Sequence, residues 1–325
     1  MDTVLENNLK GQLLDRRKRL EEAVSIKSSN DYLLSLLKEV NSALERMDKG
    51  IYGICEVCHD PIEEDRLLVD PLLKVCLGDL DHHQQKTLEM DLELASKMQN
   101  ALLPKKELNS KFWDIGYTYL PAGPVSGDYC DIISLSNDEL LFVLADVTGK
   151  GVAASMLMTQ IHAIFHSLSA FEMPLEILLE QVNRLICEGA AFSHFATLVC
   201  GKIYPDGEVE LINAGHCLPI VLKKYDIINI DSSTMPLGLF CSMQYKVQKI
   251  KMEKGESLIL YTDGLSEAMG KDEEEFGETR IINFAKSNFD KSPQKFIDSL
   301  VNDVNDFTGS SKMNDDLTIM VIKKI

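Results

Sequence analysis

The hydrophobic pattern changes near residue 110, and this change constrains the fold more than any other feature of the sequence. Before it, apolar residues recur at spacings of three and four, which is typical of amphipathic helices. After it, short β-rich runs dominate, and Pro205-Asp206-Gly207 between two of them predicts a hairpin. Strands joined by hairpins, together with grouped helices, favour antiparallel sheets over a βαβ repeat. The sequence therefore predicts a helical N-terminal part followed by an α+β domain.

We expect three segments along the chain. Residues 1–83 should hold a helical hairpin, with its turn at Ser28-Ser29-Asn30, and a turn-rich cysteine segment. Residues 84–104 predict a linker helix that Pro104 stops, and residues 105–325 predict the α+β domain. The expected helices cover 3–27, 31–49, 84–103, 152–170, 174–188, 278–288 and 292–306. The expected strands cover 112–120, 140–147, 195–204, 208–215, 219–223, 257–264 and 317–324.

The charge balance of the chain excludes some classes of partner. Lys and Arg number 33 against 51 Asp and Glu, which gives a net charge of −18. A net anion is repelled by phosphate backbones and by anionic lipid, so we expect no direct binding to nucleic acid or membrane. Long apolar runs and a signal-peptide centre are missing from the sequence, which favours a cytoplasmic protein. The five scattered cysteines are expected to be reduced: Cys130, Cys187, Cys200, Cys217 and Cys241.

Four aspartates lie at the edges of strands that should be buried. Asp128 follows Ser-Gly, Asp146 closes an apolar run, Asp263 closes another, and Asp315 precedes a third. Converging carboxylates would repel each other, and a bound divalent cation removes that conflict. All-oxygen ligand sets select Mg²⁺ or Mn²⁺, and two such ions can activate a water for attack on phosphorus. Each aspartate alone could instead form a turn, because spacing does not show that the four meet in space.

Six segments make the second domain similar to a known family. They are PAGPVSGDYCD, ADVTGKGVAASMLM, FATLVCGKIY, NAGHCLPIVL, LYTDGLSEA and DDLTIMVI. In this order they resemble the bacterial RsbU/SpoIIE-type serine phosphatases of the metal-dependent, protein phosphatase 2C-like (PP2C) superfamily. The resemblance implies an αββα sandwich of two antiparallel sheets flanked by helices. It also implies hydrolysis of phosphoserine or phosphothreonine on a protein, without a covalent phosphoenzyme.

The resemblance further implies roles for individual residues. Asp128, Asp146, Asp263 and Asp315 match catalytic metal-binding aspartates of the family, with Asp146 bridging two Mg²⁺ or Mn²⁺ ions. The backbone carbonyl of Val147 matches a further ligand. Where this chain has Ser-Gly-Asp the family more often has Gly-Gly-Asp, but this departure removes no carboxylate.

Other polar residues lie near these motifs. Asp316 is expected not to bind metal, because related phosphatases often have asparagine there. A metal-bound water, Lys150 or His216 could protonate the leaving serine oxygen, and for His216 a structural hydrogen-bonding role is the alternative that we favour. His162 and His166, four residues apart amid apolar neighbours, are expected to be partly buried helix residues rather than ligands.

Three cysteines cluster in the first third of the chain. Cys55 and Cys58 are separated by two residues, Cys76 follows, and Asp79 stands where a complete four-cysteine site would place its last cysteine. Thiolates at this spacing favour Zn²⁺, which accepts a carboxylate or a histidine as fourth ligand. His82 and His83 lie within reach in the sequence and are the alternatives to Asp79. A site with reduced thiols and no metal also fits the pattern.

The segment around these cysteines is similar to the zinc finger of DksA/TraR-type transcription factors, over about residues 30–82. Such factors enter the secondary channel of RNA polymerase, but the hairpin here is short and its tip offers one acid. We therefore favour a sensory or dimerising role for the module. The sequence LELASKMQNALLP resembles the linker before RsbU-type phosphatase domains, which implies control of the phosphatase by residues 1–100 and an upstream regulator.

The sequence as a whole predicts a metal-dependent protein serine/threonine phosphatase. By resemblance, its substrate is a small phosphorylated regulator, such as an anti-sigma-factor antagonist with a STAS fold, and the chain is a homodimer. Two other functions remain open. One is a pseudophosphatase scaffold without catalysis, but the intact set of aspartates argues against it. The other is a transcription modulator acting through the finger, but the acidic charge balance argues against it.

Overall fold

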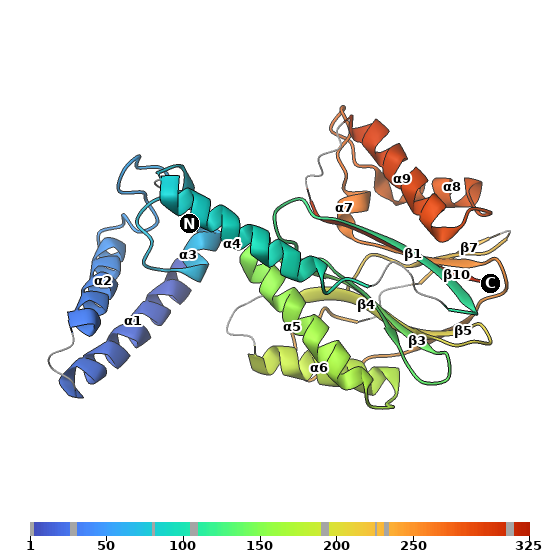
Figure 1. Cartoon of the computed structure of the whole chain (residues 1–325), viewed down its shortest axis with the longest axis horizontal. Helices are drawn as coiled ribbons and strands as arrows, with labels where there is room; N and C mark the ends of the chain where they lie inside the picture. The colour runs from blue at the N-terminus through green and yellow to red at the C-terminus, as the bar shows by residue number, and fades with distance from the viewer. Residues whose placement is uncertain are drawn as a thin grey trace. The chain divides into compact units, whose positions relative to one another are not determined.

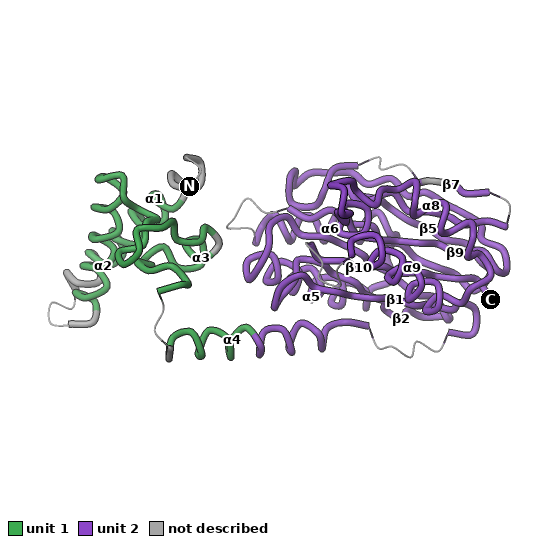
Figure 2. Tube along the Cα trace, turned by 90° about the horizontal axis from the view of Figure 1, so that it is seen from above, with its two compact units in different colours: residues 1–92 green, residues 93–325 purple. Residues whose placement is uncertain are grey.

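The chain forms two compact units, residues 1–92 and residues 93–325, in a computed structural model (Figure 2). The structure describes residues 3–26, 31–79, 82–104, 110–189, 195–224, 226–230, 234–309 and 315–325. The predicted turn at Ser28-Ser29-Asn30 lies outside these ranges. The linker helix α4 (His82–Asn100) contributes to both units, because the boundary between them falls after Leu92.

The first unit is built on two packed helices. Helix α1 (Thr3–Ile26) lies along α2 (Asp31–Asp48), and Lys10 Nζ is 2.8 Å from Asp48 Oδ1. Since Lys10 is near the start of α1 and Asp48 ends α2, the helices are antiparallel, as the predicted hairpin requires. Two short elements that were not predicted follow, α3 (Glu64–Val69) and the 3₁₀ turn η1 (Leu77–Asp79). The core of this unit consists of Leu9, Leu13, Val40, Ala43, Leu44, Met47, Tyr52, Cys55, Ile62, Leu67 and Cys76.

The described residues of the second unit form two antiparallel five-stranded sheets. The first has the order β1-β10-β9-β6-β7, with β1 (Trp113–Leu120), β10 (Leu317–Lys324), β9 (Ser257–Tyr261), β6 (Ile220–Leu222) and β7 (Ile227–Asn229). The second has the order β2-β3-β4-β5-β8, with β2 (Tyr129–Ser134), β3 (Leu140–Val147), β4 (Ala196–Ile203), β5 (Glu208–Ala214) and β8 (Gln248–Lys251). Their facing sides bury a core that includes Trp113, Phe142, Leu144, Leu260 and Met320.

Helices cover the outer face of each sheet (Figure 1). Helices α5 (Val152–Ser169) and α6 (Leu175–Gly189) pack on the β2-containing sheet. Helices α8 (Gly277–Ser287) and α9 (Pro293–Thr308) pack on the other sheet, next to the short helix α7 (Asp263–Ser266). A separate buried core fills each of these helix–sheet interfaces. The predicted αββα sandwich is therefore confirmed.

Most predicted elements are present, within a few residues at their ends. The predicted hairpin forms between β4 and β5, where Tyr204 N donates to Glu208 O at 2.9 Å and Gly207 has a φ of 92°. Strands β2, β7 and β8 were missed. Strand β2 has five consecutive buried residues, so it lacks the alternation by which a half-exposed strand is recognised. Within the described ranges, every helix is too short or too polar to cross a membrane.

Candidate functional site

The four predicted aspartates lie where paired strands of the two sheets begin and end. Asp128 precedes β2 and Asp146 is the second-last residue of the antiparallel neighbour β3. Asp263 follows β9 and Asp315 precedes the antiparallel neighbour β10. In an antiparallel pair the start of one strand lies beside the end of the next. Each sheet therefore brings two of the aspartates to the same end of the strands.

Asp128 connects the two sheets. Its side chain is 1% exposed, and its Oδ2 accepts a hydrogen bond from Thr262 Oγ1 at 3.0 Å and another from Thr318 Oγ1. Both threonines belong to the other sheet, because Thr262 follows β9 and Thr318 lies in β10. Burial, and then the charge of Asp146, raise the pKa of Asp128 well above its usual range, although the two hydroxyl donors lower it. The ionised form of this carboxylate is therefore destabilised unless a bound cation neutralises its charge.

The other three aspartates repel one another in the same way. Burial, followed by the charges of Asp263 and Asp315, raises the pKa of Asp146 to about 7. Burial and the charge of Asp315 also raise the pKa of Asp263. Lys150 offsets part of this repulsion, because its Nζ lies 2.9 Å from Asp315 Oδ2. The donors are carboxylate oxygens in mutual repulsion, so the residues fit hard divalent cations such as Mg²⁺ or Mn²⁺.

The carbonyl of Val147 lies close to the loop that carries Asp128. A Cβ atom added to Gly127 would be 2.9 Å from Val147 O and 3.3 Å from Ala154 Cβ. Real Cβ atoms do not approach a carbonyl so closely, so this position requires glycine. The close approach places the predicted carbonyl ligand directly beside the aspartate loop.

Asp316 has a different set of contacts from its neighbour Asp315. Its Oδ1 accepts a hydrogen bond from Ala122 N at 2.7 Å, and its Oδ2 accepts one from Gly127 N at 3.0 Å. Both oxygens therefore hold the backbone of the loop between β1 and β2. These contacts favour a structural role for Asp316 over metal binding.

His216 is held in a buried hydrogen-bonded turn. Its backbone N donates to Asn213 Oδ1 at 2.8 Å, and its Nδ1 lies 2.8 Å from Thr197 Oγ1. Burial lowers the pKa of His216 to about 4, so the ring is neutral at neutral pH. A neutral imidazole is a poor proton donor, and the hydrogen bonds of His216 favour the structural role expected for it.

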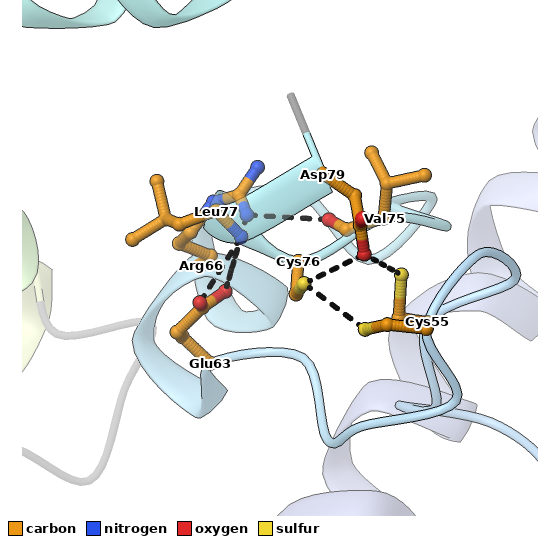
Figure 3. A network of polar contacts seen from close by, with 8 residues as sticks. Cys55, Glu63, Arg66, Val75, Cys76, Leu77 and Asp79 are labelled. Atoms are coloured by element: carbon orange, nitrogen blue, oxygen red, sulfur yellow. Dashed lines mark hydrogen bonds and ion pairs between the residues drawn. The ribbon is translucent and has the colours of Figure 1, made fainter. Parts of the chain in front are cut away.

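The cysteine segment of the first unit brings its four predicted residues together. Figure 3 shows three of them, Cys55, Cys76 and Asp79. Asp79 Oδ2 lies 3.1 Å from Cys55 Sγ and 3.2 Å from Cys76 Sγ, and Cys58 Sγ lies 3.5 Å from Cys76 Sγ. Hydrogen bonding to Asp79 is the main cause that raises the pKa of Cys58 to about 12, and the thiols in turn lower the pKa of Asp79. Three thiols and one carboxylate at this spacing fit a tetrahedral zinc site. The side chains of His82 and His83 lie outside the described residues.

Neighbouring side chains fix the turn that carries Cys76. The backbone N of Leu77 donates to Glu63 Oε1 at 3.1 Å, and Arg66 Nη1 donates to Val75 O at 3.2 Å. Arg66 Nη1 lies 3.1 Å from Glu63 Oε2, so the two side chains form an ion pair that holds both in place (Figure 3). The turn is therefore held in place by contacts other than those of the thiols.

Within the described part of the chain, two groups have all their potential metal-ligating atoms within 4.8 Å of one another. One is the cysteine cluster with Asp79. The other consists of Asp131, His162 and His166. The sequence pattern pointed to the two histidines but not to Asp131, because strand β2, which carries it, has no recognisable alternation. Among the described residues, the four predicted aspartates are not part of either group.

Comparisons with known proteins agree with the architecture. Residues 136–324 match the family model of Stage II sporulation protein E (SpoIIE), and residues 50–78 match that of the prokaryotic DksA/TraR C4-type zinc finger. Protein IcfG of Synechocystis sp. is 28% identical over 262 residues, which are 72% of this chain and 41% of IcfG. Phosphoserine phosphatase RsbU of Bacillus subtilis is 25% identical over 270 residues, which are 79% of either chain.

A solved structure has the same fold. The SiaA-PP2C domain of Pseudomonas aeruginosa superimposes with a TM-score of 0.66 at 17% identity, covering 74% of this chain and 98% of that domain. The SpoIIE model covers more than half of the chain, and the described strands and helices of the second unit reproduce the PP2C sandwich. The second unit therefore has the fold of the SiaA-PP2C domain, and the chain belongs to the SpoIIE family.

Proposed function

We propose that the chain is a protein serine/threonine phosphatase that depends on Mg²⁺ or Mn²⁺ and hydrolyses phosphoserine or phosphothreonine on a regulatory protein. The observation that carries the proposal is the convergence of four aspartates from two sheets, with the pKa of Asp146 raised to about 7. A fold without a cation requirement would gain stability by avoiding such repulsion. The named phosphoserine phosphatase among its relatives supports the same activity.

The residues of the site divide into ligands and supports. Asp128, Asp146, Asp263 and Asp315, with the carbonyl of Val147, would hold two ions. When bound, Mg²⁺ or Mn²⁺ would supply the Lewis-acid chemistry that activates water for attack on phosphorus.

Other groups of the chain support these ligands. The hydroxyls of Thr262 and Thr318 orient the Asp128 carboxylate. Asp316 orients the loop that precedes Asp128. Lys150, whose side chain is exposed at the site, would donate a proton to the leaving serine oxygen.

The test is Mn²⁺-dependent hydrolysis of a phosphoserine peptide by the full chain. Asp146→Asn and Asp263→Asn should each lower kcat/KM by more than about 100-fold, because even second-shell changes at metal sites cost 10–100-fold. Asp138→Asn is the matched control, since Asp138 is an exposed carboxylate in the turn between β2 and β3. Unchanged activity in the folded Asp146 and Asp263 variants would refute the proposed roles.

We further propose that the substrate is an anti-sigma-factor antagonist with a STAS fold. The similarity to RsbU supports this substrate class. The full chain should dephosphorylate a phosphorylated STAS protein with a higher kcat/KM than a peptide containing the same phosphoserine. Equal values for the protein and the peptide would count against recognition of the folded substrate.

We propose that residues 1–83 form a regulatory module, that residues 84–104 link it to the phosphatase domain at 105–325, and that the chain is a homodimer. Helix α4 supports the last point, because Met90, Leu94 and Met98 form an exposed apolar stripe at a spacing of four residues. A second copy of this helix would cover the stripe. Leu94→Glu should convert a dimer into a monomer in light scattering, whereas Glu93→Gln, on a neighbouring exposed position, should not.

A further inference from the structure

A second cluster of metal-binding residue types lies between β2 and α5, apart from the aspartate site. Asp131 Oδ2 lies 2.7 Å from His166 Nε2 and 3.4 Å from His162 Nδ1. The two histidines are four residues apart on α5, so they share one face of the helix. Asp131 belongs to β2, so the cluster spans a strand and the helix that covers it.

The carboxylate of this cluster is fixed by other contacts. Tyr129 Oη donates to Asp131 Oδ2 at 2.8 Å, and the backbone N of Ile132 donates to Oδ1 at 2.7 Å. The Asp131 side chain is 4% exposed, whereas that of His166 is 45% exposed. The cluster therefore has a rigid buried end and an end that opens to solvent.

His162 has a ligand atom that is not otherwise used. Its Nδ1 is buried and has no hydrogen-bond partner among the described residues, although it points toward Asp131 at 3.4 Å. Burial is the main cause that lowers the pKa of His162, and the proximity of His166 lowers it further. A metal ligand must be a neutral imidazole, so this environment favours the ligating form.

We propose that Asp131, His162 and His166 bind one divalent transition-metal ion, with Zn²⁺ as the expected occupant. Two imidazoles and one carboxylate select ions such as Zn²⁺ over Mg²⁺, which prefers oxygen donors. The site is distinct from the aspartate site, because Asp128 bonds to threonines of the opposite sheet while Asp131 faces α5. The fourth position of the ion would face solvent beside His166.

The distances of the cluster are compatible with this ion. Zinc bonds of about 2.0 Å place tetrahedral donor atoms about 3.3 Å apart. The separation of 3.4 Å between His162 Nδ1 and Asp131 Oδ2 already has this value. The separation of 2.7 Å between His166 Nε2 and Asp131 Oδ2 must widen by about 0.6 Å, using the same bond lengths. The half-exposed ring of His166 has the freedom to make this movement.

The test measures zinc bound to the full chain, dialysed against Zn²⁺ in the presence of excess Mg²⁺ to occupy the oxygen-ligand site. His166→Gln and His162→Gln should each bind one zinc ion fewer than the wild-type protein. Ser167→Ala is the matched control, because Ser167 is exposed on the same helix and its hydroxyl donates to Ala163 O of α5. Cys58→Ser should remove a different zinc ion. A protein with both Cys58→Ser and His166→Gln should therefore bind two zinc ions fewer than the wild type.

Cobalt absorption separates the two kinds of site. Co²⁺ at the histidine site should give ligand-field bands without thiolate charge-transfer bands. His166→Gln should therefore lower the ligand-field absorption and leave the charge-transfer bands unchanged. Asp131→Asn should weaken binding as well, and the exposed His166 variant answers the question if the Asp131 variant fails to fold. Equal zinc content in His166→Gln, His162→Gln and Ser167→Ala would overturn the proposal. The proposed phosphatase activity would stand in either case, since it is measured with Mn²⁺ at other residues.

Discussion

Gln99 holds the backbone of Ser126 through two hydrogen bonds. Its Nε2 donates to Ser126 O at 2.7 Å, and its Oε1 accepts from Ser126 N at 3.0 Å. Gln99 lies near the end of α4 and is 6% exposed, while Ser126 lies two residues before Asp128. The end of the linker helix therefore supports the loop that carries an expected metal ligand, and both residues belong to the second unit.

We expect Gln99→Ala to raise the Mn²⁺ concentration for half-maximal phosphatase activity by about tenfold, because changes in the support of metal ligands cost 10–100-fold in affinity. The maximal rate at saturating Mn²⁺ should fall less. Asn100→Ala is the control, since Asn100 is exposed and bonds within its own helix. A variant that was merely less stable would lose active protein without shifting the Mn²⁺ midpoint, and such a result would contradict the positioning role.

Gly127→Ala should lower Mn²⁺-dependent activity by about 10–100-fold, the range for disturbed metal surroundings. The added methyl would lie 2.9 Å from Val147 O, so either this carbonyl or the Asp128 loop must move. Gly123→Ala is the matched control in the same loop, where the added atom would meet its nearest neighbour at 3.5 Å. Steady-state kinetics over a range of Mn²⁺ concentrations measures both variants, and equal activity of the two would show that the close approach is unimportant.

His216 should make the free energy of unfolding depend on pH. Burial lowers its pKa from 6.5 to about 4, so between these values the unfolded chain binds a proton that the folded chain does not. The wild-type protein should therefore lose stability as pH falls from about 6.5 to about 4, by at most about 3 kcal/mol. His216→Asn should lack this component, whereas His59→Asn, at an exposed histidine, should retain it.

Urea unfolding at several pH values measures this effect as a difference between wild type and variant. Taking the difference cancels the titration of the aspartates, which are present in both proteins. The difference in unfolding free energy between wild type and His216→Asn should be constant above pH 7 and should shrink as the pH is lowered. A difference that stays constant down to pH 4 would show that His216 is protonated equally in both states.

Zinc should stabilise the first unit, and Asp79 should limit how tightly it binds. Asp79→Cys completes a four-thiolate set, so more chelator should be needed to remove the ion. Cys58→Ser should lose the ion and lower the unfolding temperature of this unit. Elemental analysis and calorimetry with and without chelator measure these effects, with Asp70→Cys as a control at an exposed position nearby. Equal chelator sensitivity of wild type and Asp79→Cys would show that Asp79 is not a ligand.

The α+β class, the helical hairpin and most strands of the second unit follow from the order of residues alone. Periodic apolar residues identify such elements because each must bury one face, and Pro205-Asp206-Gly207 forms its hairpin from local turn chemistry alone. The order of the six motifs sufficed to predict the αββα sandwich by resemblance. The tight group of Cys55, Cys58, Cys76 and Asp79 follows from local spacing as well.

Which distant residues meet became visible only in the folded chain. Strand β2 is buried on both faces and carries no periodic signal, so Asp131 could not be paired with His162 and His166 from the sequence. The contact of Gln99 with Ser126 and those of Thr262 and Thr318 with Asp128 likewise join elements far apart in the chain. Such contacts depend on how sheets and helices pack, and packing is a property of the whole core that no local pattern records.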